Sequence, residues 1–138
     1  PEKHFEAMNL NSDMKHLKKK VDAGAEFIVT QLFYDNEKYF DFVKKCREIG
    51  ITVPIIPGLK PLTTLRHLSF IPKFFHVNFP EELSNELEKC KTNDEVKKVG
   101  IEWSVKQAKE LIQQETPVLH FYTMGKGEAV RKIASQVF

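Results

Sequence analysis

Residues 27–33 read Phe-Ile-Val-Thr-Gln-Leu-Phe, a short run that is rich in β-branched and aromatic residues. Its apolar residues are nearly continuous rather than alternating, which is typical of a parallel strand covered on both faces. Residues 52–58 and 118–123 form two further runs of this kind, although Pro54 and Pro57 remove backbone donors from the first of them. The sequence therefore predicts three buried strands.

Segments with apolar residues at helical spacing alternate with these strands. The polar residues at 11–13, 35–36 and 93–94 are candidate N-caps, and Gly24 and Gly50 are candidate C-terminal stops. Residues between the second and third strands that are rich in proline are expected to form short helical turns. We predict helices at 13–23, 37–48, 81–90 and 93–114, short turns at 59–80, and a final helix that opens at Gly125 or Gly127.

Strands that alternate with helices imply βαβ crossovers and a parallel sheet, so the predicted fold class is α/β. Three parallel strands cannot close a barrel, for which the common version needs eight. The strands therefore either pair with a missing segment of a parallel α/β barrel or form a small open sheet flanked by helices. A chain of 138 residues suffices for one core, so we expect a single domain.

The composition is that of an ordinary soluble protein, with 41% hydrophobic residues, 29% charged residues and a net charge of +2. It shows no footprint for nucleic acid and no apolar run long enough to span a membrane. Cys46 and Cys90 lie far apart without metal-ligand spacing, so we expect no disulfide, no metal site and a cytoplasmic location. The start lacks signal-peptide features, and its first residue is Pro1 rather than Met, which hints at a longer parent protein.

Ligands of parallel α/β proteins bind at the carboxyl ends of the strands, which makes the residues there the candidates for function. Gln31 can offer two donors and an acceptor to a heterocyclic ring, or it can simply bond loop backbone. His120 and Tyr122 share one face of the last strand. Their alternative is structural, as a hydrogen-bonded core His and a Tyr whose hydroxyl finds a carbonyl.

Two basic segments are weaker candidates. The run Lys-His-Leu-Lys-Lys-Lys at 15–20 can hold a phosphate or pyrophosphate through its ammonium groups, or it can be a solvated helix face. Gly-Lys-Gly at 125–127 lacks the spacing of a Walker motif or of GxGxxG, and it is poor evidence for a phosphate loop.

Five short motifs occur along the chain: PEKH with EA at 1–7, KKKVDAGA at 18–25, IVTQLFYD at 28–35, IIPG at 55–58 and LHFYT at 119–123. Each is modest alone, but their order and spacing resemble the methylenetetrahydrofolate reductase family across the whole chain. The match corresponds to the carboxy-terminal half of that family's catalytic barrel.

This resemblance implies a (βα)8 TIM barrel of which residues 1–138 are a partial domain with strands six to eight. It implies an FAD enzyme that takes a hydride from NAD(P)H and converts 5,10-methylenetetrahydrofolate to 5-methyltetrahydrofolate in one-carbon metabolism and methionine biosynthesis. The family's general acid and the Asp beside its flavin belong to the earlier half of the barrel. We therefore expect no catalytic residue in this piece, no turnover by it alone, and a parent protein that forms a homo-oligomer.

The resemblance also assigns binding residues. Lys19 and Lys20 fall where the family contacts the FAD pyrophosphate, Gln31 matches the Gln that bonds the pterin, and Phe70, or Ile71 next to it, would face the benzoyl ring. Lys126 stands where many relatives have an Arg, which keeps the charge but loses the planar fork. The full set is His4, Ala7, Asp13, His16, Lys19 and Lys20 for FAD, and Gln31, Tyr39, Phe70, Tyr122 and Lys126 for folate.

Two other functions are compatible with the same residues. The chain can be a non-catalytic folding or assembly module that binds its missing half, or a second copy, through exposed sheet edges. It can also be half of another barrel enzyme in which the Lys run binds a phosphorylated substrate.

Overall fold

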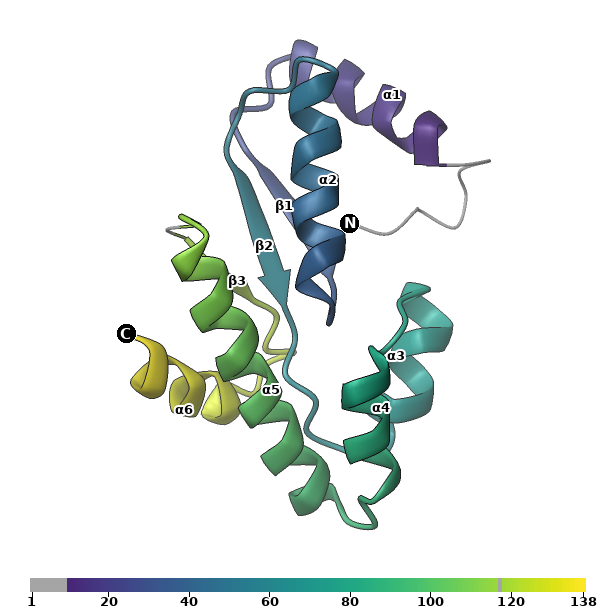
Figure 1. Ribbon diagram of the computed structural model, residues 1–138, viewed down its shortest axis with the longest axis vertical. Helices are drawn as coiled ribbons and strands as arrows, with labels where there is room; N and C mark the ends of the chain where they lie inside the picture. Colours follow the sequence, from purple (N-terminus) through teal and green to yellow (C-terminus); the bar gives the residue numbers. More distant parts are fainter. Residues whose placement is uncertain (1–9, 117) are drawn as a thin grey trace.

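The computed structural model of the chain describes residues 10–116 and 118–138 (Figure 1). His4 and Ala7, two of the predicted flavin contacts, lie outside the described residues. Helices and strands alternate as the sequence predicts. In chain order the described elements are α1 (Leu10–Asp22), β1 (Ile28–Leu32), α2 (Asn36–Glu48), β2 (Ile55–Leu59), α3 (His67–Phe75), α4 (Glu81–Glu88), α5 (Asn93–Gln113), β3 (His120–Phe121) and α6 (Glu128–Val137).

The strands form one parallel sheet in the order β1-β2-β3, which confirms the predicted α/β class with its parallel pairing. Ile28 lies opposite Ile55 at the amino ends, and Gly58 lies opposite His120 at the carboxyl ends. Helix α2 runs back along β1 and β2, antiparallel to them (Figure 1). This is the arrangement of successive βα units, and it is consistent with part of a barrel.

The central strand carries Pro57, which has no N–H to give to a neighbour. The pairing of β1 with β2 is irregular at this point, between Val29 and Leu32. The next residue, Gly58, donates its N–H to the side-chain oxygen of Thr30 at 2.9 Å instead of to a backbone carbonyl. A side chain therefore replaces one link of the backbone ladder at the carboxyl end of the sheet.

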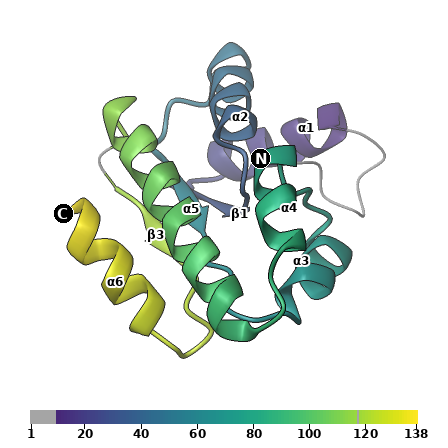
Figure 2. The same ribbon diagram turned by 60° about the horizontal axis from the view of Figure 1, so that its bottom comes forward.

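Two apolar clusters form the core. The first joins the sheet to α2 and α5 through residues such as Phe33, Leu59 and Leu111. The second joins α3, α4 and the first half of α5 beyond the carboxyl ends of the strands, and it includes Ile71 and Leu83. Figure 2, which brings the lower end forward, shows α5 between α6 on one side and α3 with α4 on the other.

The observed elements differ from the predictions at four places. Helix α1 begins at Leu10, so residues 11–13 lie inside it rather than before it. The cap of α5 is Thr92, whose side chain accepts the N–H of Glu95, and not the Asn and Asp that follow. In β3 only two residues pair, against the six predicted.

The fourth difference is α3, a nine-residue helix where short turns were expected. Pro72 lies inside it and cannot donate to the carbonyl of Leu68, which normally weakens a helix. The opposing contribution is burial: Ile71 is 1% exposed in the second cluster, and Leu68 packs against the same cluster. Tertiary packing therefore maintains a helix that local sequence signals disfavour.

Candidate functional site

The carboxyl ends of all three strands meet at one edge of the sheet, because Leu32 pairs with Gly58 and Gly58 pairs with His120. Gln31 lies at this edge near the end of β1, and its side chain is exposed. Tyr122 directly follows β3 and is half-buried. The structure thus brings together two residues that the sequence singled out, although 91 positions separate them (122 − 31).

Tyr122 ties the three strands together at this edge. Its hydroxyl donates to the carbonyl of Thr30 at 2.8 Å, and its ring passes directly over Gly58. The ring also meets that of His120 edge-on, with centroids 4.6 Å apart. Burial raises the pKa of Tyr122, so the phenol stays protonated and the hydrogen bond persists at neutral pH.

A cavity of about 380 Å³ opens beyond this edge, between the strand ends and α3. Phe70 lines it, as does Ile71, the neighbouring position at which the resemblance placed an aromatic contact. The Phe70 ring stacks on Phe74 at 4.4 Å between centroids, and the Arg66 guanidinium lies 5.5 Å from its centroid. The lining residues are Leu32, Lys60, Thr64, Arg66, His67, Phe70, Ile71, Phe75 and Met124.

Cationic side chains crowd one wall of this cavity. Lys60 follows β2 and is only 7% exposed, and desolvation by burial lowers its pKa. Burial, together with the positive charges of Lys60 and Arg66, lowers the pKa of His67 to about 4. His67 is therefore neutral at pH 7, and its Nδ1 accepts the backbone N–H of Thr63 at 3.0 Å.

The depressed pKa of His67 predicts how stability depends on pH. The folded protein binds this proton near pH 4 and the unfolded chain near 6.5, so the unfolded state holds more protons between these values. Stability should fall by about 2 kcal/mol as the pH drops from 7 to 4. Denaturant titrations of wild type and His67→Gln at several pH values test this. The free energy of unfolding of the variant should lack the decrease between pH 7 and pH 4 that His67 causes in wild type. The exposed His16→Gln should keep it, and a His67→Gln profile parallel to wild type contradicts the assignment.

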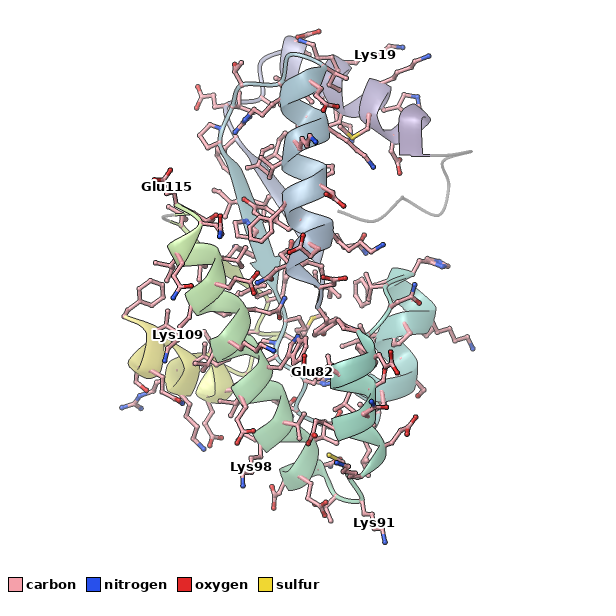
Figure 3. All side chains as sticks on the ribbon, viewed as in Figure 1. Lys19, Glu82, Lys91, Lys98, Lys109 and Glu115 are labelled. Atoms are coloured by element: carbon pink, nitrogen blue, oxygen red, sulfur yellow. The ribbon has the colours of Figure 1, made fainter. Side chains whose placement is uncertain are left out.

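The predicted flavin contacts lie elsewhere in the molecule. Helix α1 packs near the amino ends of β1 and β2, away from α3 (Figure 1). On this helix Asp13 is half-buried, and His16, Lys19 and Lys20 are exposed, with Lys19 at the upper end of the molecule in Figure 3. The described structure therefore does not bring this group to the edge that holds Gln31.

Tyr39 and Lys126, the remaining predicted residues, have contrasting surroundings. Tyr39 is 4% exposed, its hydroxyl donates to the carbonyl of Ile55 at 2.6 Å, and its ring stacks on Phe33. It also lines a larger cavity of about 650 Å³ at the amino ends of the strands. Lys126 is exposed in the turn before α6. Because parallel sheets bind ligands at the carboxyl ends, we take the smaller cavity as the candidate site.

Lys60 and His67 line the cavity but were not among the residues predicted from the sequence. A signal for Lys60 was present, since it is a single cation directly after a buried apolar strand. His67 had none, because only the fold of α3 brings it to the cavity.

The part of the chain that the structure describes lacks two features. In residues 10–116 and 118–138, no helix is long and apolar enough to cross a membrane. The same residues contain no cluster of three His, Cys, Asp or Glu that could hold a metal ion.

These features define a class, namely a parallel α/β protein with a cavity at the carboxyl ends of its strands. The family model for methylenetetrahydrofolate reductase matches residues 1–137, so the chain belongs to that family. This confirms the resemblance noted from the five motifs.

Named relatives agree with the family. The chain is 39% identical over 132 residues to a probable methylenetetrahydrofolate reductase (NADPH) of Caenorhabditis elegans, covering 94% of this chain and 20% of that protein. It is 44% identical over 114 residues to methylenetetrahydrofolate reductase (NADH) 1 of Arabidopsis thaliana, covering 82% and 19%. For the Salmonella typhimurium 5,10-methylenetetrahydrofolate reductase the identity is 35% over 129 residues, covering 93% and 44%. The chain thus spans from about a fifth to less than half of the length of these relatives.

A solved structure supports the fold. It is that of an uncharacterized protein from Clostridium thermocellum that binds two copies of 5-methyl-5,6,7,8-tetrahydrofolic acid. The two chains superpose with a TM-score of 0.57 at 20% sequence identity, covering 93% of this chain and 48% of the other. At this level of identity the match concerns the fold alone.

Proposed function

We propose that this chain forms part of the folate-binding rim of a reductase that converts 5,10-methylenetetrahydrofolate to 5-methyltetrahydrofolate. The observation that carries the proposal is the cavity at the carboxyl ends of the strands, which has Phe70 in its wall and Gln31 at the same edge of the sheet. The proposed reaction is that of the family to which the chain belongs. The relatives whose names include NADH and NADPH support a nicotinamide reductant.

Each predicted substrate residue has a role that its surroundings permit. Gln31 is exposed, so its amide can pair with the donors and acceptors of the pterin ring. Phe70 offers a ring face for the benzoyl group. Tyr122 already gives its hydrogen to Thr30, so we assign it a positioning role with its oxygen still able to accept. Tyr39 is buried and bonds the carbonyl of Ile55, so its proposed role is to position β2 rather than to contact the folate. Lys126 is an exposed cation after β3 that can contact an acidic part of the substrate.

FAD is the proposed hydride carrier between the nicotinamide and the folate. Lys19 and Lys20 on α1 are proposed to hold its diphosphate, because their ammonium groups are exposed, although the described structure places them away from the edge that holds Gln31. Lys18 is less suitable, since it pairs with Asp22 at 2.7 Å. In this proposal His4, Ala7, Asp13 and His16 complete the contacts with the flavin nucleotide.

The acid that protonates the substrate is assigned to another part of the barrel. The residues that line the cavity include no Asp or Glu. A well-placed general acid commonly contributes 10²- to 10⁴-fold in rate. We therefore expect residues 1–138 alone to give no turnover. From the resemblance to the family we propose that these strands are the sixth to eighth of a (βα)8 barrel.

Replacing Gln31 tests the proposed function. In the intact protein, Gln31→Ala should lower kcat/KM for the folate substrate about 10- to 100-fold, because a buried pterin would lose its paired amide. The KM for the nicotinamide should stay within about twofold if the amide contacts only the pterin. Steady-state kinetics with each substrate varied in turn give both values.

The matched control is Gln113→Ala, which removes an exposed amide from the last residue of α5. Both variants should unfold at the wild-type temperature, since neither side chain is buried. Unchanged folate kinetics for Gln31→Ala contradict the proposed site. A protein that reduces no folate at all contradicts the proposed function.

A further inference from the structure

Lys60 is a cation for which the described structure shows no anionic partner. Its side chain lines the cavity beyond the strand ends and is 7% exposed. The hydrogen bond that it makes there runs from Nζ to the carbonyl of the adjacent Pro61, at a long 3.3 Å. An ammonium group has three donors, and burying it without a counter-charge costs free energy. A ligand that brings a negative charge would remove that cost.

The other polar groups of the cavity wall are also mainly donors. His67 accepts a backbone N–H through Nδ1, which leaves the proton of the neutral ring on Nε2. Arg66 contributes a guanidinium, and no acidic side chain is among the lining residues. Lys60, His67 and Arg66 therefore form a donor wall that suits an oxyanion and opposes a cation.

The rest of the lining decides which oxyanion fits. Five of its nine residues are apolar, namely Leu32, Phe70, Ile71, Phe75 and Met124. Such a surface suits a ligand that joins an aromatic ring to a carboxylate, because the apolar residues would contact the ring and would offer nothing to a phosphate alone. The volume, about 380 Å³, is that of a small-molecule site.

We propose that Lys60 is a specificity residue that binds a carboxylate of the glutamate tail of the folate, with the adjoining benzoyl ring against Phe70. The inference rests on the proposed function and adds a determinant to it. Gln31 selects the pterin end of the substrate, while Lys60 requires that the other end be acidic. A folate without its glutamate should therefore gain nothing from Lys60.

The test compares two ligands in the intact protein, 5-methyltetrahydrofolate and the same compound without glutamate, 5-methyltetrahydropteroate. Lys60→Met keeps the length of the side chain and removes the charge. It should raise the Kd for the glutamate-bearing ligand about 10- to 100-fold, the loss expected for one charge-assisted hydrogen bond. The Kd for the pteroate should stay within about twofold. Titration calorimetry measures both.

The control variant is Lys109→Met, which removes a charge from the exposed face of α5 and should change neither Kd (Figure 3). The melting temperature of Lys60→Met should equal or exceed that of wild type, because a buried unpaired charge is replaced by an apolar chain. Lys60→Arg should retain preference for the glutamate-bearing ligand, which a purely structural lysine would not predict.

Several results would overturn the inference. Equal weakening of both ligands would make Lys60 structural, and no change in either would remove it from the site. A rise confined to the KM for NADPH would assign the wall to a phosphate of the nicotinamide. If wild type binds the two folates equally well, only the role of Lys60 fails. If it binds neither, the proposed function fails as well.

Discussion

Gly58→Ala is expected to lower the free energy of unfolding by about 3 kcal/mol and to abolish tight folate binding. A Cβ at this position would lie 2.4 Å from the carbonyl oxygen of Thr30 and 2.6 Å from the Tyr122 ring. Both distances are shorter than van der Waals contact, and the first involves backbone. Either β1 and β2 must separate or Tyr122 must leave its hydrogen bond with Thr30.

The substitution should affect the site because this glycine pairs with Leu32, the neighbour of Gln31, and lies two residues before Lys60. Denaturant unfolding gives the loss of stability, and ligand titration gives the loss of affinity. Gly127→Ala is the matched control, since a Cβ there meets nothing within 4 Å and its φ of −91° suits alanine. It should change stability by less than about 1 kcal/mol. Equal stabilities for the two variants would show that Tyr122 and Thr30 do not pack on Gly58 as described.

Patterns local to the chain predicted most of the fold. The apolar run at 27–33 and the cap at Asp35, whose side chain accepts the N–H of Glu37 at 3.0 Å, specify β1 and α2 without help from distant residues. Helix α3 could not be predicted this way, because Pro72 disfavours it and only contacts with the second cluster compensate. The short β3 has a similar cause, since strand length depends on the partner strand as well as on propensity.

The residues of the candidate site also differ in whether local patterns or distant contacts place them. The common position of Gln31 and Tyr122 could be predicted, because strand ends can be located in a sequence and the strands of a parallel sheet end at one edge. Lys60 could have been singled out as a cation directly after an apolar strand, but its burial follows from the fold, and His67 reaches the cavity only because α3 forms. For the Lys run on α1 the sequence left open a phosphate contact or a solvated face; Lys15, Lys19 and Lys20 are exposed, and the position of the run relative to the cavity depends on how the whole helix packs.

Gly100→Ala should be the more destabilising of the two glycine substitutions, with a loss of about 3 kcal/mol or more. In the interior of a helix this change normally stabilises by about 1 kcal/mol, because glycine is the more flexible residue. Gly100 lies in the middle of α5, where a Cβ would fall 1.9 Å from the carbonyl oxygen of Leu62 and 2.9 Å from its nitrogen. The steric cost therefore reverses the usual sign.

This contact matters for the site because Leu62 lies two residues after Lys60, on the segment that enters the cavity wall. Displacing α5 should move that segment, so Gly100→Ala should also weaken folate binding from outside the cavity. Since the clash is with backbone, truncating the Leu62 side chain should not restore the stability that Gly100→Ala loses. Lys98→Ala, at an exposed position of the same helix, should stay within about 0.5 kcal/mol of wild type. If Leu62→Ala restored the stability of Gly100→Ala in a denaturant titration, α5 would contact the Leu62 side chain there and not its backbone.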